Sequence, residues 1–192
     1  MKLFSPLYNR AMQWARHQHA QRYLVGLSFA ESSFFPIPPD VMLMPMSLAN
    51  PSRALWFASI TTIASVLGGL LGYLIGLFAF DMVEPLLQSA GYYPKYLQAK
   101  TWFDEWGFWA VFLAGFSPIP YKVFTITAGV ISMALAPFVI ASLIGRGGRF
   151  FFVAMLMAWG GERMENMLHK YVDRLGWLIV ALVIVVVLMV KH

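Results

Sequence analysis

The stretch Phe35-Pro36-Ile37-Pro38-Pro39-Asp40 decides the fold, because its pattern returns at Ser117-Pro118-Ile119-Pro120-Tyr121-Lys122. Pro-Ile-Pro holds the same place in both copies, and the first copy ends in an acid where the second ends in a base. Prolines lack the backbone N–H that a helix interior needs, so a helix should not run through either copy. We therefore predict two turns between helices, made by Pro36, Pro38 and Pro39 in the first copy and by Pro118 and Pro120 in the second.

The apolar arms beside these turns are too short to cross a membrane. Residues 23–35 and 41–49 flank the first turn, and residues 108–116 and 123–131 flank the second. At about 1.5 Å per residue, none of these arms covers a hydrocarbon core of about 30 Å. The pattern predicts two re-entrant hairpins, with one proline-kinked span over residues 23–49 as the alternative for the first. Such a broken backbone must be buried in protein or face water, because lipid offers it no hydrogen bonds.

The composition is typical of an integral membrane protein. Of 192 residues, 59% are hydrophobic and 12% charged, and the mean hydropathy is +0.66, far from an average soluble domain. Nucleic-acid binding is the rival explanation of a sequence pI near 9.6, but no basic stripe accompanies it. The absence of cysteine excludes disulfides and thiolate metal sites, and neither an HExxH nor a Gly-x-Ser-x-Gly motif is present. We therefore expect no metal, no cofactor, no nucleic-acid partner and no enzymatic activity.

Two longer apolar runs, residues 54–80 and 133–159, are long enough to span a membrane with some tilt. Residues 81–106 combine acidic side chains with several aromatic anchors, which predicts an interfacial linker on the outer side. Within this linker, Pro94 should begin a short surface helix that Gly107 ends.

The N-terminal segment carries four basic residues before any acid: Lys2, Arg10, Arg16 and Arg22. By the positive-inside rule, they predict a cytoplasmic N-terminus. The apolar residues of segment 3–20 follow helical spacing, which indicates an amphipathic helix on the inner leaflet. A frayed polar leader is the alternative.

The order of surface helix, hairpin and span occurs twice, which is an internal repeat. We predict an all-α polytopic membrane protein with a single membrane domain over residues 1–192. Its first repeat is residues 1–80, its second, inverted repeat is residues 81–160, and residues 161–192 form an amphipathic segment and a C-terminal transmembrane helix. Because a re-entrant hairpin does not change sides, the two repeats must have opposite orientations. Carriers built from inverted repeats with broken helices bind their cargo where the repeats meet.

Five charged residues interrupt the apolar segments: Glu31, Asp40, Lys122, Arg146 and Arg149. Each costs about 2.5–3.5 kcal/mol at the bilayer centre. One interpretation is a buried network that only fixes the fold. Three bases against two acids still leave one positive charge, which suits a phosphate.

We therefore assign Lys122, Arg146 and Arg149 to anionic headgroup binding. Glu31 and Asp40 are assigned to proton or cation coupling, because desolvated carboxylates bind protons more readily. We also expect Asp40 to meet Lys122.

Two sets of small residues accompany these features. The first repeats every four residues in the first long run and predicts close helix packing: Ala64, Gly68, Gly72 and Gly76. The second leaves room beside the two arginines for a bulky headgroup or for a close backbone: Gly145, Gly147 and Gly148.

Three blocks of the sequence resemble the DedA family of membrane proteins (VTT, or SNARE-associated, domain), close to its YqaA-like branch. The blocks are FAESSFFPIPPD at 29–40, GFSPIPYK at 115–122 and GRGGRF at 145–150. The resemblance implies a bacterial inner-membrane protein that moves lipids between leaflets and uses the proton-motive force. It implies that the family's essential acidic pair falls on Glu31 and Asp40. In the second hairpin, better-known members carry two arginines, whereas this chain has Phe116 and Lys122.

The sequence thus predicts a lipid flippase or scramblase that recognises a phosphate-bearing headgroup, couples to protons and supports envelope and membrane homeostasis. The cargo would be a phospholipid or a polyprenyl phosphate, and a homo-oligomer is compatible with this architecture. Two alternatives stay open. The chain could be a small-solute or ion transporter on the same fold, or a membrane structural or assembly factor that transports nothing.

Overall fold

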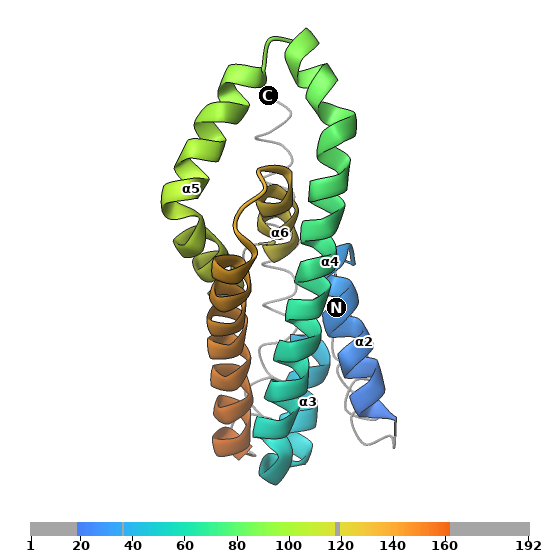
Figure 1. Ribbon diagram of the computed structural model, residues 1–192. Helices are drawn as coiled ribbons and strands as arrows, with labels where there is room; N and C mark the ends of the chain where they lie inside the picture. The colour runs from blue at the N-terminus through green and yellow to red at the C-terminus, as the bar shows by residue number, and fades with distance from the viewer. Residues whose placement is uncertain (1–18, 36, 118–119, 162–192) are drawn as a thin grey trace, which may run out of the picture.

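The computed structural model describes residues 19–35, 37–117 and 120–161 (Figure 1). All regular structure in these ranges is helical, which confirms the predicted all-α class. The elements in chain order are α2 (Ala20–Ser33), α3 (Asp40–Ala49), the 3₁₀-helix η1 (Pro51–Arg53), α4 (Ala54–Ser89), α5 (Tyr93–Phe116), α6 (Tyr121–Val130) and a last helix, Leu135–Gly161. The predictions of an N-terminal amphipathic helix and of a C-terminal helix at 175–190 concern segments outside the described residues.

Among the described residues, two helices are long and apolar enough to cross a membrane, as the sequence predicted for residues 54–80 and 133–159. They are Pro51–Met82, with a mean hydropathy of 2.1, and Leu135–Gly161, with a mean hydropathy of 1.5. Less than half of the most apolar window of each helix is buried within the protein. Large apolar side chains such as Leu67 and Phe78 point outward. This outward apolar surface suits lipid better than it suits the core of a soluble protein.

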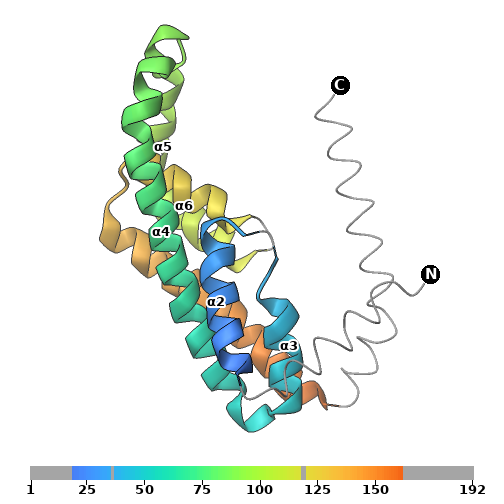
Figure 2. The same ribbon diagram turned by 90° about the vertical axis from the view of Figure 1, so that its right-hand side faces the viewer.

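The first proline turn separates two short helices. α2 has 14 residues and α3 has 10, so they are about 21 and 15 Å long. They run in opposite directions along one half of α4 (Figure 2). This bent pair replaces the alternative of a single kinked helix over residues 23–49, because α2 ends at Ser33 and α3 begins only at Asp40.

Residues 81–116, which lead up to the second turn, differ from the structure that the sequence predicted. Residues 81–106 are not a linker, since α4 continues to Ser89 and α5 starts at Tyr93 after a turn at Gly91, whose φ is +73°. Pro94 does lie in the first turn of α5, but Gly107 does not end it. The short arm predicted for residues 108–116 is therefore the end of a 24-residue helix. A glycine inside a helix costs only about 1 kcal/mol relative to alanine. At Gly107 the side chains of Phe103 and Met133 occupy the space that a Cβ would need.

Each hairpin has its own apolar core. One cluster joins α2, α3 and α4 to the lower part of the last helix and includes Leu24 and Phe150. The other joins α5, α6 and the upper part of α4 to the start of the last helix and includes Tyr121 and Phe138. In Figures 1 and 2, α2 and α3 lie beside one half of α4, and α5 and α6 lie beside the other half. The two turns therefore meet near the middle of the molecule.

The small residues of α4 let both hairpins approach its backbone. A Cβ at Gly68 would collide with the carbonyl oxygen of Phe29 in α2, and one at Gly76 would collide with that of Ile126 in α6. A Cβ at Gly72 would lie 2.5 Å from Thr125 Oγ1. The predicted packing ridge is confirmed, and it fixes where the tips of the two hairpins meet.

Candidate functional site

Four of the five charges form two ion pairs between the last helix and the first hairpin. Arg146 Nη2 pairs with Glu31 Oε2, and Arg149 Nη2 lies 2.7 Å from Asp40 Oδ2. Because Arg146 and Arg149 are three residues apart, they share one face of the helix. Glu31 lies near the end of α2 and Asp40 is the first residue of α3. The last helix therefore holds both arms of the first hairpin through charge.

Arg146 is the more enclosed of the two arginines. Only 2% of its side chain is exposed. Its Nε donates to Ser65 Oγ at 2.6 Å, and its Nη2 also donates to Ser32 Oγ at 3.1 Å. The guanidinium carbon lies 4.9 Å from the centre of the Tyr121 ring and 4.7 Å from that of Phe150. These two rings belong to different apolar clusters, so Arg146 sits at the boundary between the two hairpin cores.

Arg149 connects the two turns directly. While Nη2 holds Asp40 of the first hairpin, Nη1 donates to the backbone carbonyl of Ser117 at 3.0 Å, at the end of α5. The side chain of Arg149 is 21% exposed and that of Asp40 is 15% exposed. The second oxygen of Asp40, Oδ1, is buried without a hydrogen-bond partner among the described residues. The site is therefore enclosed, but one of its carboxylate oxygens lacks a hydrogen bond from the described residues.

Lys122 does not meet Asp40, so the expected contact was wrong. Its Nζ instead lies 3.4 Å from the carbonyl oxygen of Phe35, on the turn of the first hairpin. Asp40 is already held by Arg149, whose planar fork suits a carboxylate better than the point charge of a lysine does. In the described part of the chain, Lys122 has no carboxylate partner. The surplus positive charge of the cluster is thus carried by Lys122, where the two turns face each other.

The glycines beside the arginines serve mainly backbone packing. A Cβ at Gly145 would lie 2.5 Å from the carbonyl oxygen of Phe112 in α5. At Gly147 and Gly148 a Cβ would make ordinary contacts at 3.5 Å with Thr62 and Phe116. Of the two alternatives for this motif, a close backbone therefore accounts for Gly145.

Sequence reasoning missed the polar residues that hold the arginines in place. Ser32 and Ser65 bond Arg146, and Tyr121 stacks on it while donating to Ser142 Oγ at 2.5 Å. Isolated serines inside an apolar run were the available signal. It is weak, because a helical serine often bonds its own backbone, as Ser28 does to Leu24 at 2.6 Å.

Over residues 19–35, 37–117 and 120–161, the fold and the site define an all-helical structure with two apolar helices of spanning length and a charged cluster where the two helix pairs meet. The model of the VTT domain matches residues 35–159, so the chain belongs to this family, as its resemblance to DedA proteins indicated. Its assignment to the YqaA-like branch stays a prediction.

Three relatives illustrate this membership. Uncharacterized proteins of Haemophilus influenzae and Histophilus somni are each 48% identical to the chain, over 192 and 191 residues, and these matches cover both chains completely. Undecaprenyl phosphate transporter A of Staphylococcus aureus is 32% identical over 120 residues, which is 57% of this chain and 59% of that protein. No solved structure matches the chain significantly.

Proposed function

We propose that the chain is a membrane transport protein that moves a phosphate-bearing lipid between leaflets, with protons as the coupling ion. The observation that carries this proposal is the position of Arg149, which bonds Asp40 of one hairpin and the Ser117 carbonyl of the other. Lys122, which has no carboxylate partner among the described residues, adds a positive charge where the two turns face each other. Similarity to a protein named undecaprenyl phosphate transporter A supports the same class of cargo.

The chemistry of the site favours exchange between a carboxylate and a phosphate. An arginine binds either group through paired, charge-assisted hydrogen bonds. Asp40 and a headgroup phosphate would therefore compete for Arg149. A proton taken up by Asp40 would remove its negative charge and release Arg149 to the phosphate. Proton binding and lipid binding would then favour each other, which is the requirement for coupling.

This proposal gives each of the five charged residues a more specific role than the sequence did. Lys122 and Arg149 bind the headgroup, and Asp40 exchanges the proton. Arg146 keeps its assignment to the anion site only as a neighbouring charge, because its donors already reach Glu31, Ser32 and Ser65. Glu31 supplies the counter-charge to Arg146. Together the five residues carry the net positive charge that a phosphate would neutralise.

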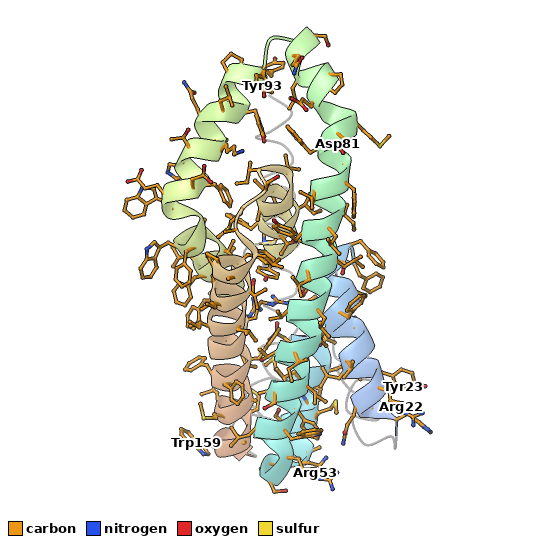
Figure 3. The ribbon with its side chains drawn as sticks, viewed as in Figure 1. Arg22, Tyr23, Arg53, Asp81, Tyr93 and Trp159 are labelled. Carbon is orange, nitrogen blue, oxygen red and sulfur yellow. The ribbon has the colours of Figure 1, made fainter. Side chains whose placement is uncertain are left out.

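We further propose that both bent helix pairs are re-entrant in a bacterial inner membrane. The first pair is too short to span it, and the last helix and α4 supply the crossings. The two ends of the molecule differ in charge: Arg22 and Arg53 lie at one end, and Asp81 lies toward the other (Figure 3). The aromatic side chains of Trp159 and Tyr93 mark the same two ends, as in membrane interfaces. The basic end would face the cytoplasm.

A topology reporter tests this orientation. A reporter enzyme fused after residue 95, within the first turns of α5, should be active only when the fusion point lies outside the cytoplasm. The expected result is periplasmic activity, because residues 81–106 carry four acids against two lysines and so lack the excess of positive charge that retains a segment inside. A fusion after Arg53, at the basic end, is the matched control and should report the cytoplasm. Cytoplasmic activity at residue 95 would overturn the orientation.

Transport itself is tested in liposomes that contain the purified chain. Fluorescent polyprenyl phosphate and fluorescent phosphatidylethanolamine are placed in one leaflet, and a proton gradient is imposed in either direction. The expected result is movement of at least one of these lipids at a rate that follows the gradient. Liposomes without protein and liposomes with a proton ionophore are the controls.

The same assay separates the alternatives. Proton movement without lipid movement would favour a small-solute or ion transporter. If neither protons nor lipids move, the remaining function is that of a structural or assembly factor, whose buried charges only join the hairpins.

A further inference from the structure

The two ion pairs of the site differ in how firmly the protein holds them. Around the Glu31–Arg146 pair, two serine hydroxyls connect the same two charges by a second route. Arg146 Nε donates to Ser65 Oγ at 2.6 Å, the two serine oxygens lie 2.7 Å apart, and Ser32 Oγ donates to Glu31 Oε2 at 3.1 Å. Since Arg146 Nη2 reaches Glu31 directly, these bonds form a closed ring.

The direction of every bond in this ring is determined. A hydroxyl has one proton, and that of Ser32 is donated to Glu31, so the bond between the serines must be donated by Ser65. Each hydroxyl therefore both donates and accepts, and bonds arranged in this way strengthen one another. Ser32 and Ser65 are fully buried, and the ring joins α2, α4 and the last helix. Opening it would leave several buried polar groups without partners.

The Asp40–Arg149 pair has no such ring. One oxygen of Asp40 carries the bond to Arg149, while the other is buried without a partner in the described part of the chain. The second bond of Arg149 goes to the carbonyl of Ser117, at the break between α5 and α6. The arginine of this pair is 21% exposed, against 2% for the arginine of the first pair, while the two carboxylates are about equally exposed, at 15% and 16%. Of the two arginines, Arg149 is therefore the one that a ligand can reach.

We propose that Ser65 is a positioning residue that keeps the Glu31–Arg146 pair closed throughout transport, so that only the Asp40–Arg149 pair opens to admit the headgroup phosphate. This inference rests on the proposed function and adds that one ion pair has a structural role while the other binds the headgroup. The closed pair joins the first hairpin to the last helix at the boundary between the two apolar cores. Arg149, three residues further along the same helix, exchanges Asp40 for the headgroup phosphate.

The first test compares two buried serines. Ser65→Ala removes the acceptor of Arg146 Nε, whereas Ser28→Ala removes a hydroxyl that bonds only its own helix. Ser65→Ala should lower the maximal lipid transport rate about tenfold, the effect of losing one charge-assisted hydrogen bond. The lipid concentration for half-maximal rate should stay unchanged, because Arg149 is intact. Ser28→Ala should match the parent in both. Equal rates for the two variants, or a raised half-maximal concentration in Ser65→Ala, would overturn the role of Ser65.

The second test follows the two pairs during transport. The natural chain has no cysteine, so single cysteines report one position each to a small charged thiol reagent. Ser65→Cys should stay unlabelled with and without polyprenyl phosphate and a proton gradient. Ser117→Cys should be labelled, at a rate that the lipid changes. Ser32→Cys reports on the same ring and replaces Ser65→Cys if that variant does not fold.

The outcomes separate the two proposals. A parent chain that moves no lipid removes the proposed function and this inference with it. A parent chain that moves lipid while Ser65→Cys or Ser32→Cys is labelled as fast as Ser117→Cys removes this inference alone. Lipid movement with an unlabelled ring and a lipid-sensitive Ser117→Cys supports both.

Discussion

Replacing Glu31 by alanine should destabilise the protein by about 3–5 kcal/mol, the usual cost of leaving one partner of a buried ion pair alone. Arg146 is only 2% exposed, and a guanidinium cannot shed its proton to escape the penalty. The change also removes the acceptor for the Ser32 hydroxyl. The measurement is the apparent melting temperature in detergent, together with the fraction of protein that elutes as a single species.

A double substitution is the matched control for this prediction. In Glu31→Leu with Arg146→Met, both charges are gone, and apolar residues of similar size fill the space. Such replacements of buried pairs are often neutral or stabilising, so the double variant should melt higher than Glu31→Ala. A Glu31→Ala variant as stable as the parent would contradict the prediction, since it would mean that water reaches Arg146 in the folded protein.

The sequence predicted the helices around the first turn well, because prolines act locally. Three prolines at 36–39 prevent helical hydrogen bonding whatever surrounds them, and α2 and α3 end and begin beside them. The apolar runs were predicted for a similar reason, since a long uninterrupted run has few alternatives to a helix. The five charges could also be selected from the sequence alone, because each is costly in apolar surroundings and so needs a partner.

The end of α4 at Ser89 and the continuation of α5 through Gly107 were less accessible to sequence reasoning. Pro85 lies inside α4, and Gly107 lies inside α5, although both residue types usually mark the ends of helices. At Gly107 the local cost is offset by packing against a distant part of the chain, whereas the side chain of Pro85 is exposed. At Gly107 this partner is Met133, which the sequence places far away. Contacts of this kind override local propensity.

The pairing within the site could not be predicted either. Sequence reasoning matched Asp40 with Lys122 because both end a Pro-Ile-Pro motif. The pairing depends instead on the direction in which the last helix presents its arginines to the first hairpin. That direction follows from the packing of Gly145 against Phe112 and of Phe150 in the core around α2. Ser65 lies on α4, remote in sequence from both Glu31 and Arg146, so its contact is visible only in three dimensions.

Replacing Asp40 by asparagine should uncouple transport from the proton gradient while leaving the protein folded. Asparagine keeps the shape and one oxygen acceptor for Arg149, but it has no titratable group. If Asp40 is the proton-binding residue, lipid should still move down its own gradient in this variant, and reversing the proton gradient should not change the rate. Asp81→Asn is the matched control, because Asp81 is an exposed acid far from the site (Figure 3), and it should respond to the gradient like the parent.

Replacing Arg149 by glutamine should have the larger effect on the same assay. The change removes the charge that a phosphate would bind and also the bond to the Ser117 carbonyl. The loss of one or two charge-assisted hydrogen bonds predicts a fall in lipid transport of about 10- to 100-fold. Because Arg149 is 21% exposed and Asp40 is 15% exposed, water can reach the carboxylate that the substitution leaves without its arginine, so the variant should keep most of its thermal stability. A folded Arg149→Gln variant that transports lipid at the parent rate would show that the headgroup binds elsewhere, and it would point to Lys122, which has no carboxylate partner among the described residues. An Asp40→Asn variant that still follows the proton gradient would show that the proton binds elsewhere.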